Sequence, residues 1–253
     1  MENRQAIEYF HLSFCHQLGS KVDRKHYCLK GGCNLRFFLR SYRYSEDIDF
    51  DVQTTSLETL KKNVEKILDS GDFRYRLKNY KEIEIVEWTA SKQTQTTQRW
   101  KIRFRYKNQS QPIYTKIEFS RRKTIIDAKI ELVPQNLIST YELQPIIIPH
   151  YPIPTAIKQK VEALIGRTQT EARDVIDLKI MKDQIADLKI PLSPEEKEKS
   201  LETLLSISFD QFNSQVHPYL TQEYQDVFNS EETWSQIQSE VIGFIENQPE
   251  KEP

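Results

Sequence analysis

The sequence predicts an α+β protein in which a mixed α/β half precedes an α-helical half. All the segments with the polar–apolar alternation typical of strands lie before residue 121. A proline-rich stretch at 145–155 follows, and the chain after it has the spacing of apolar residues that is typical of helices. We therefore expect a first lobe at residues 1–150, built as a mixed sheet with helices on one face, and a helical lobe at 151–253.

The individual elements follow from local pattern. In the first half, helices are expected at 3–18, 34–39 and 57–69, and strands at 26–29, 47–52, 82–88, 100–107 and 114–120. We expect the prolines at 145, 149, 152 and 154 to prevent regular structure between the two halves. In the second half, helices are expected at 170–182, within 208–228 and at 231–246, with capping boxes formed by Thr168 with Glu171 and by Ser193 with Glu196.

Composition excludes several classes of protein. The chain has 36 Lys and Arg against 37 Asp and Glu, so any contact with nucleic acid must come from a local basic surface. The three cysteines form no C-x-x-C pair, which argues against a disulfide framework or a structural zinc site. No run of about 18 apolar residues could span a membrane, and the amino terminus lacks a signal-peptide pattern. We expect a cytoplasmic protein.

Residues 47–52 carry the strongest chemical signal. Because side chains alternate along a strand, Asp47, Asp49 and Asp51 share one face, and Ile48 and Phe50 lie on the other. Carboxylates spaced in this way can share hard cations, and Mg²⁺ prefers such ligands together with water and phosphate oxygens. The alternative interpretation is a solvated strand with acidic residues facing outward.

A glycine turn precedes this strand. Lys30, Gly31, Gly32 and Cys33 lie between an expected strand and an expected helix. Glycines let the backbone approach a phosphate, and the start of the following helix offers unpaired N–H groups. The spacing fits neither a P-loop nor a dinucleotide fingerprint. The alternative is an ordinary turn.

A basic strand and its expected partner supply a third carboxylate. The cations of the first strand are Lys101, Arg103, Arg105 and Lys107, which share one face. Pairing Phe104 with Ile117 and Ile102 with Phe119 keeps the apolar residues together. This register places Arg103 opposite Glu118 and Arg105 opposite Lys116. Glu118 is then a candidate third metal ligand, or else a member of a cross-strand ion pair. The basic face could hold a triphosphate or a nucleic-acid backbone, or be the face of a solvated edge strand.

The Gly-Gly turn, the D-x-D strand and the later single carboxylate resemble the polymerase-β-like nucleotidyltransferases. More narrowly, KGGCNLRFFLRSYRYSEDIDFDV resembles the AbiEii/AbiGii family, to which the MenT toxins are related. A lysine-bearing helix with Lys160, and the helix with Arg173, Asp174 and Asp177, resemble two further family motifs. The likeness extends over roughly residues 1 to 185.

The resemblance implies a polymerase-β-like nucleotidyltransferase lobe followed by an α-helical lobe, with the active site between lobes. The expected catalytic residues are Asp47, Asp49, Glu118, Lys160, Asp174 and Asp177, of which Asp47, Asp49 and Glu118 are the expected metal ligands. The expected nucleotide-binding residues are Lys30, Gly31, Gly32, Cys33, Arg36, Ser45 and Arg103. Ordinary ion pairs between neighbouring helices are the alternative interpretation of the residues in the second lobe.

The expected function is Mg²⁺-dependent nucleotidyl transfer, with Mn²⁺ as a possible substitute. An acceptor hydroxyl attacks the α-phosphorus of an NTP and pyrophosphate leaves. The resemblance implies an RNA acceptor, first of all a tRNA 3′ end, and a toxin of a type IV toxin–antitoxin or phage-abortive system with a cognate antitoxin protein. The family usually has Thr or Ser where this chain has Cys33, a weaker hydrogen-bond donor. A catalytically weak nucleotide-binding module that acts through a protein partner is therefore an alternative, and transfer of a phosphoryl group or modification of a protein is another.

Overall fold

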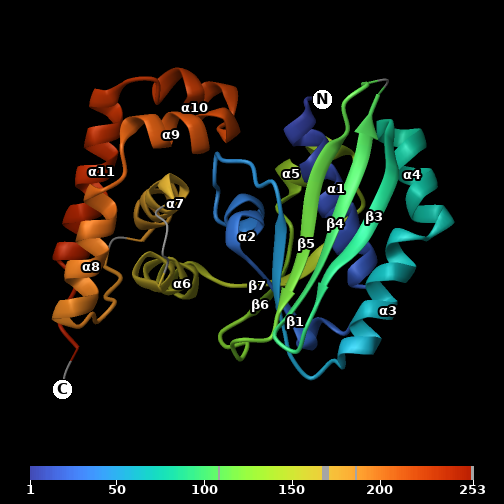
Figure 1. The fold of residues 1–253 in the computed structure, drawn as a ribbon, viewed down its shortest axis with the longest axis horizontal. Coiled ribbons are helices and arrows are strands. Elements are labelled where there is room, and N and C mark those ends of the chain that lie inside the picture. Colours follow the sequence, from blue (N-terminus) through green and yellow to red (C-terminus); the bar gives the residue numbers. More distant parts are fainter. Residues whose placement is uncertain (108, 167–170, 186, 252–253) are drawn as a thin grey trace. The chain divides into compact units, whose positions relative to one another are not determined.

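The computed structural model spans residues 1–253, and it describes residues 1–107, 109–166, 171–185 and 187–251. The chain forms two compact units (Figure 1). Unit 1 comprises Met1–Phe38 and Tyr44–Tyr151, and unit 2 comprises Leu39–Arg43 and Pro152–Pro253. The short segment 39–43 thus leaves the first unit to join the second.

Unit 1 is built on one mixed sheet of seven strands in the order β3-β4-β5-β2-β1-β7-β6. The strands are β1 Tyr27–Lys30, β2 Ile48–Val52, β3 Ile83–Gln93, β4 Thr97–Tyr106, β5 Ile113–Ser120, β6 Lys129–Leu132 and β7 Ile147–His150. β2 is parallel to β5, and β1 is parallel to β7, whereas the other neighbours are antiparallel. The helices of this unit are α1 Asn3–Leu18, α2 Gly31–Phe38, α3 Leu57–Leu68, α4 Gly71–Lys81 and α5 Gln135–Tyr141, with a 3₁₀ turn, η1, at Arg24–His26.

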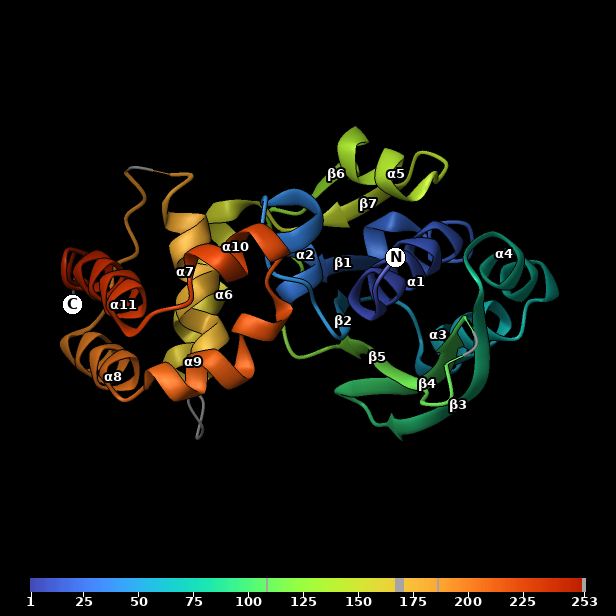
Figure 2. The ribbon, with the colours of Figure 1, turned by 90° about the horizontal axis from the view of Figure 1, so that it is seen from above.

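The core of unit 1 lies between the sheet and α1, α3 and α4 (Figure 2). Phe10 of α1 stacks on Phe104 of β4 with ring centroids 5.6 Å apart, and Phe14 lies against Phe50 of β2. Phe50 in turn stacks on Phe119 of β5 at 4.9 Å. Because the apolar residues of each strand face these helices, alternation turns the acidic residues of β2 and the basic residues of β4 to the other face. The expected α+β fold, with a mixed sheet and helices, is confirmed.

The hairpin register expected from the sequence is wrong by four residues. Arg99 lies opposite Glu118, and Lys101 lies opposite Lys116, where Arg103 and Arg105 had been expected. β4 begins earlier than expected, at Thr97. An even shift leaves every apolar residue on the core face, so alternation alone cannot distinguish the two registers.

The expectation that prolines prevent regular structure across 145–155 is also wrong. β7 includes Pro149, which pairs with Ile130 of β6. On its other side β7 pairs with β1 at His150. The pairing with β1 therefore does not need the backbone N–H group that Pro149 lacks. Helix α6 starts at Ile153, and its Pro154 falls in the first turn, where an N–H group has no intrahelical partner. The sequence reading also missed α4, α5 and β6.

The regular elements of unit 2, among its described residues, are helices. Its helices are α6 Ile153–Gly166, α7 Ala172–Lys182, α8 Pro194–Leu205, α9 Phe209–Gln215, α10 Gln222–Val227 and α11 Glu231–Glu246, with a 3₁₀ turn, η2, at His217–Tyr219. The capping box of Ser193 and Glu196 starts α8, as expected, whereas Thr168 lies outside the described residues. Tyr42 stacks on Tyr224 of α10 at 3.8 Å, which attaches the segment 39–43 to this unit. Among the described residues, no helix is long and apolar enough to cross a membrane.

One aspartate of β2 is part of the interior. Asp51 is 1% exposed, and its carboxylate forms an ion pair with Lys30 at 2.5 Å and accepts a hydrogen bond from the Tyr151 hydroxyl at 2.9 Å. A buried carboxylate is stable only when its oxygens are paired. Asp51 therefore joins β1, β2 and the residue that follows β7.

We predict that Tyr151→Phe lowers the free energy of unfolding by about 1.5–3 kcal/mol, the contribution of a hydrogen bond to a buried charged group. Urea unfolding of the full chain measures this. Tyr80→Phe is the matched control, because the Tyr80 side chain is 67% exposed. Unfolding of Tyr151→Phe at the wild-type urea concentration would show that the hydroxyl does not stabilise Asp51.

Candidate active site

The strand registers bring three carboxylates together. Asp49 of β2 lies directly beside Glu118 of β5, and Asp47 precedes β2 by one residue. Asp49 also pairs in register with Lys30 of β1, and Glu118 with Arg99 of β4. A single row across four strands therefore reads Arg99, Glu118, Asp49, Lys30, with Asp47 next to it.

The charges of these carboxylates are coupled. Burial, followed by the negative charges of Asp47 and Glu118, raises the pKa of Asp49 to about 6, and the positive charges of Lys30 and Lys116 oppose the rise. A nearby like charge disfavours the ionised form of an acid. Burial and the two neighbouring carboxylates thus both disfavour the ionised form of Asp49.

Two of the carboxylates are held by cations. Asp47 accepts a hydrogen bond from the backbone N–H of Lys116 at 3.0 Å, and its other oxygen lies 2.8 Å from the Lys116 ammonium. Glu118 forms an ion pair with Arg99 at 2.6 Å. Neither cation was identified as a site residue from the sequence. Lys116 could have been found from its place two residues before Glu118, whereas Arg99 required the correct register.

The donor set suits a hard divalent cation. Three carboxylates, two on neighbouring strands and one directly before β2, supply the oxygen ligands that Mg²⁺ prefers. In the described part of the chain, no group of three or more His, Cys, Asp or Glu side chains is already arranged as a metal cage. A cation at this position would therefore replace Lys116 on Asp47 and Arg99 on Glu118.

The backbone next to Asp49 requires a glycine at position 31. Gly31 has a φ of +64°, and a Cβ atom at this position would lie 3.2 Å from Oδ2 of Asp49. The left-handed backbone and the close carboxylate both favour glycine. Gly31 is also the first residue of α2, so the unpaired N–H groups of the first helical turn lie beside the carboxylates.

The Cys33 side chain points into the core. It is 1% exposed, and its Sγ lies 3.3 Å from the carbonyl oxygen of Asp47 and 3.4 Å from Nδ1 of His11. Burial raises the pKa of this thiol well above its usual value, so it stays protonated and its one S–H can donate to either acceptor. The Ser45 hydroxyl also donates to the Asp47 carbonyl, at 2.8 Å. Ser45 thus holds the backbone that carries Asp47, and the Cys33 sulfur packs against it.

His11 completes this support, which sequence reasoning missed. It is fully buried, and burial lowers its pKa to about 3, so the ring is neutral. Its Nε2 lies 2.7 Å from the Thr115 hydroxyl, which donates to the carbonyl oxygen of Glu46 at 2.7 Å. Because the Thr115 hydrogen goes to Glu46, the neutral ring donates its Nε2–H to Thr115, and its Nδ1 accepts the S–H of Cys33. One hydrogen-bonded path thus joins His11 to the peptide unit of Glu46, and the Cys33 sulfur lies against the carbonyl oxygen of Asp47.

The structure pairs the other expected nucleotide-binding side chains with acidic residues. Arg36 forms a 2.6 Å ion pair with buried Glu8 and lies over the Tyr44 ring. Arg103 pairs with Glu87 of β3 at 2.8 Å. Their assignment to the nucleotide stays a prediction.

A second ionic cluster lies wholly within unit 2. Lys160 of α6 contacts Asp174 at 2.8 Å and Asp177 at 2.5 Å, and Arg43 forms a two-pronged pair with Asp177 at 3.0 Å. Burial alone would raise the pKa of Asp177, but Arg43 and Lys160 outweigh it and hold this pKa below its usual value. The expected proximity of Lys160 and the two aspartates of α7 is present, and Arg43 is a member that the sequence reading missed. Arg173 pairs instead with Glu171.

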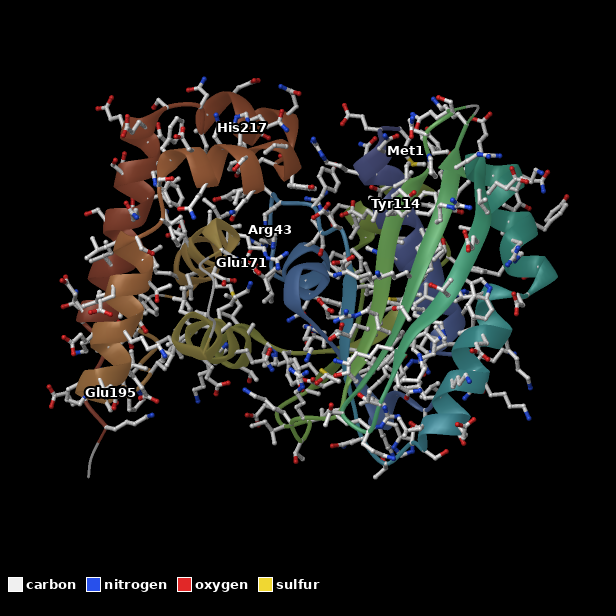
Figure 3. All side chains as sticks on the ribbon, viewed as in Figure 1. Met1, Arg43, Tyr114, Glu171, Glu195 and His217 are labelled. Atoms are coloured by element: carbon white, nitrogen blue, oxygen red, sulfur yellow. The ribbon has the colours of Figure 1, made fainter. Side chains whose placement is uncertain are left out.

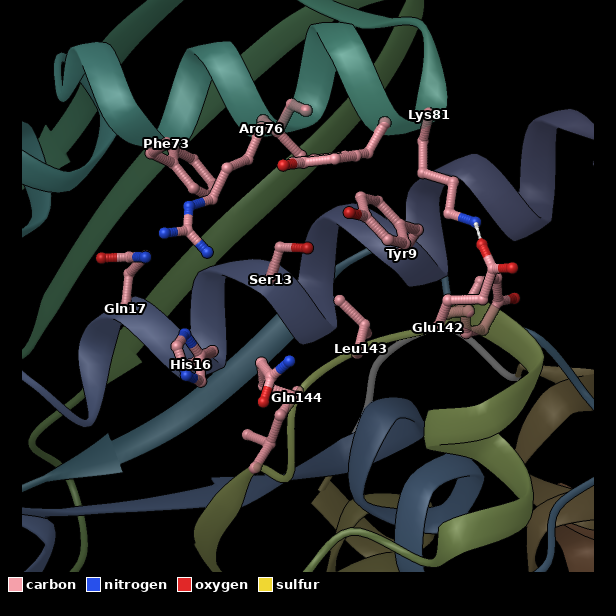
Figure 4. A pocket seen from close by; sticks show the side chains of 14 residues that line it. Tyr9, Ser13, His16, Gln17, Phe73, Arg76, Lys81, Glu142, Leu143 and Gln144 are labelled. Carbon is pink, nitrogen blue, oxygen red and sulfur yellow. Dashed lines mark hydrogen bonds and ion pairs between the residues drawn. The ribbon is translucent and has the colours of Figure 1, made fainter.

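A cavity of about 320 Å³ lies elsewhere in unit 1, between α1, α4 and the segment after α5 (Figure 4). Tyr9, Ser13, Arg76 and Glu142 are among the side chains that line it. It is on the helical side of the sheet, and none of the expected site residues lines it.

Comparisons with known proteins identify the family and similar folds. The family described as "Nucleotidyl transferase AbiEii toxin, Type IV TA system" matches residues 16–245. The structure of JHP933 from Helicobacter pylori is similar with a TM-score of 0.60 and 17% identity, covering 97% of this chain and 94% of that one. A second H. pylori structure, of a candidate nucleotidyltransferase, has a TM-score of 0.62 and 16% identity, covering 97% of each chain. No curated protein sequence matches. At these identities the structures support the fold alone, and the match over residues 16–245 shows that the chain belongs to the AbiEii family of nucleotidyltransferase toxins of type IV toxin–antitoxin systems.

Proposed function

We propose that this chain transfers a nucleoside monophosphate from an NTP to an RNA acceptor, with a tRNA 3′ end as the first candidate, and that Mg²⁺ supports the reaction. The observation that carries the proposal is the set formed by Asp47, Asp49 and Glu118 beside the amino terminus of α2. Family membership supports nucleotidyl transfer and a toxin that a cognate antitoxin neutralises.

Asp47, Asp49 and Glu118 would hold Mg²⁺, or Mn²⁺ in its place. When bound, the ion supplies positive charge for the triphosphate and favours ionisation of the acceptor hydroxyl. Glu118 is the proposed acceptor of that proton. The new bond joins the acceptor oxygen to the α-phosphorus, and the bond to the pyrophosphate oxygen breaks.

The chain's own cations and N–H groups bind the rest of the nucleotide. Gly32 and Cys33 lie in the first turn of α2, and their N–H groups are the proposed donors to phosphate oxygens. Lys116 and Arg99 form ion pairs with Asp47 and Glu118, and with a cation on these carboxylates both side chains would be free to neutralise phosphate charge. In this proposal Lys116 and Arg99 would exchange their carboxylate partners for phosphate oxygens.

Lys160, Asp174 and Asp177 are proposed as active-site groups of unit 2. Asp177 fixes Arg43 and Lys160 together, and its low pKa keeps it ionised across the physiological range. A positioning role for Asp177 and a phosphate-neutralising role for Lys160 follow from this arrangement.

We predict opposite effects of Asp49→Asn on activity and on stability. Transfer from α-labelled NTPs into total RNA, assayed with each NTP in turn, falls by at least about a hundredfold because a metal ligand is lost. In metal-free buffer at pH 8 the variant melts a few degrees higher than wild type, because the neutral amide removes charge repulsion.

The pH dependence of this gain has a definite sign. The pKa of Asp49 is raised to about 6, so ionised Asp49 destabilises the fold above that pH. Below about pH 4 the carboxyl is protonated in both folded and unfolded states, and the gain disappears.

Mg²⁺ raises the melting temperature of wild type but not of the variant. Asp226→Asn, at an exposed residue of α10, is the control. Full transfer activity in Asp49→Asn would refute the assignment.

Cys33→Ser separates this proposal from a catalytically weak module. Because the thiol points toward His11 and the Asp47 carbonyl, we predict transfer within about threefold of wild type and a stability loss of about 1–2 kcal/mol for a buried hydroxyl. Steady-state transfer assays and urea unfolding measure the two effects, with Cys15→Ser as the matched buried thiol. A tenfold or greater increase in transfer would show that Cys33 limits phosphate binding. Calorimetric binding of NTP and Mg²⁺ without turnover in wild type would favour the weak module.

A further inference from the structure

One exposed face of the sheet is organised as a track that leads away from the carboxylates. On β4 the outward residues are Arg99, Lys101, Arg103 and Arg105, and on β5 they are Glu118, Lys116 and Tyr114. Adjacent strands lie about 4.8 Å apart, and successive outward residues of a strand about 6.8 Å apart. From Arg99 to Arg105 the track is therefore about 20 Å long.

The charge changes sign along this track. At one end Glu118 lies beside Asp49, and one row further Lys101 lies directly opposite Lys116. Like charges directly opposite one another destabilise an antiparallel pair. Asp47 neutralises Lys116, but among the described residues Lys101 forms no ion pair, so this row has an unmatched positive charge.

In the part of the chain that the structure describes, the two glutamates of β3 on this face form ion pairs with other residues, whereas Arg105 does not. Glu87 of β3 pairs with Arg103, and Glu84 pairs with Lys78 of α4. Arg105 is exposed and, within the described ranges, forms no ion pair although Glu84 is its neighbour in register. Lys101 and Arg105 are thus two free cations on one strand, two residues either side of Arg103.

An exposed aromatic ring lies among these cations. Tyr114 is opposite Arg103, its side chain is 64% exposed, and Figure 3 labels it on β5. A large ring left in solvent gains nothing for the fold. Aromatic rings that alternate with cations are the usual surface for single-stranded nucleic acid, because bases stack on the ring while phosphates bind the cations.

We propose that the outward face of β4 and β5 binds the single-stranded 3′ segment of the acceptor RNA. Lys101 and Arg105 contact its phosphates, Tyr114 stacks on a base, and the strand end reaches Glu118. The inference rests on the proposed transfer to RNA, and it adds the surface and the single-stranded form of the acceptor. A triphosphate is too short to contact both cations while it occupies the carboxylate end, because Lys101 and Arg105 lie about 14 Å apart.

The test compares Lys101→Gln/Arg105→Gln with a matched pair, Lys62→Gln/Lys66→Gln, whose exposed lysines lie on α3, on the other face of the sheet. Binding of a labelled single-stranded RNA 12-mer to the full chain is measured by fluorescence anisotropy without NTP. We expect the first pair to weaken binding about tenfold and to reduce the slope of log K against log salt by about 1.4, or 0.7 per phosphate contact. The second pair should match wild type.

Tyr114 provides an independent readout. Tyr114→Ala should weaken RNA binding about tenfold with an unchanged salt slope, and Tyr114→Phe should retain wild-type affinity, because stacking needs the ring and not the hydroxyl. In transfer assays the variants should raise the KM for RNA and leave the kcat little changed. A merely structural role for Tyr114 would change the melting temperature instead.

The outcomes separate this inference from the proposed function. If the Lys101/Arg105 variant binds the 12-mer as wild type does, with the same salt slope, the track is refuted even if transfer to RNA is observed. If wild type binds the 12-mer through these residues but transfers no nucleotide to any RNA, the track stands and the transfer proposal fails. Binding of a duplex RNA as tightly as the single strand would refute the single-stranded form.

Discussion

The site depends on one electrostatic constraint, which is that three carboxylates must lie side by side in a folded protein. Asp49 lies beside Glu118 and close to Asp47, and burial, followed by the negative charges of these two neighbours, raises the pKa of Asp49 to about 6. Without a cation the fold limits this cost by pairing Asp47 with Lys116 and Glu118 with Arg99. In the proposed function, the same two cations would be available for phosphate with a metal ion in their place.

The rest of unit 1 holds this arrangement in position. A neutral, buried His11 donates to Thr115, which donates to the peptide unit of Glu46, and it accepts the S–H of Cys33, whose sulfur lies against the Asp47 carbonyl. Asp51, on the same strand, is neutralised separately by Lys30 and Tyr151, so it does not add to the charge of the site. Networks in which every buried polar group is paired rigidify their surroundings, and this one fixes the strand whose carboxylates would bind the cation.

Local pattern predicted what alternation and turn chemistry determine, and it failed where tertiary pairing decides. Strict alternation placed Asp47 and Asp49 on one face. The glycine turn was expected before a helix at 34–39, but α2 already begins at Gly31, and the positive φ of Gly31 was not predicted. The hairpin register was missed because a shift of four residues leaves every side chain on the same face of the sheet. Arg99 was therefore not recognised as the partner of Glu118. The sequence could not predict that the Cys33 side chain points inward, because this depends on a contact with His11, 22 residues away. Arg43 was missed for the same reason, since it joins Asp177 only through the fold.

The coupling of Asp47, Asp49 and Glu118 into one cation site is the central claim. Carboxyl ¹³C NMR of the metal-free full chain, with the Asp49 resonance assigned by its loss in a variant, measures it most directly. The account predicts that Asp49 titrates near pH 6, that Asp47→Asn lowers this pKa toward the usual value of about 4, and that Mg²⁺ lowers it further. A titration of Asp49 near pH 4 in the metal-free protein, unchanged by Mg²⁺ or by Asp47→Asn, would contradict it.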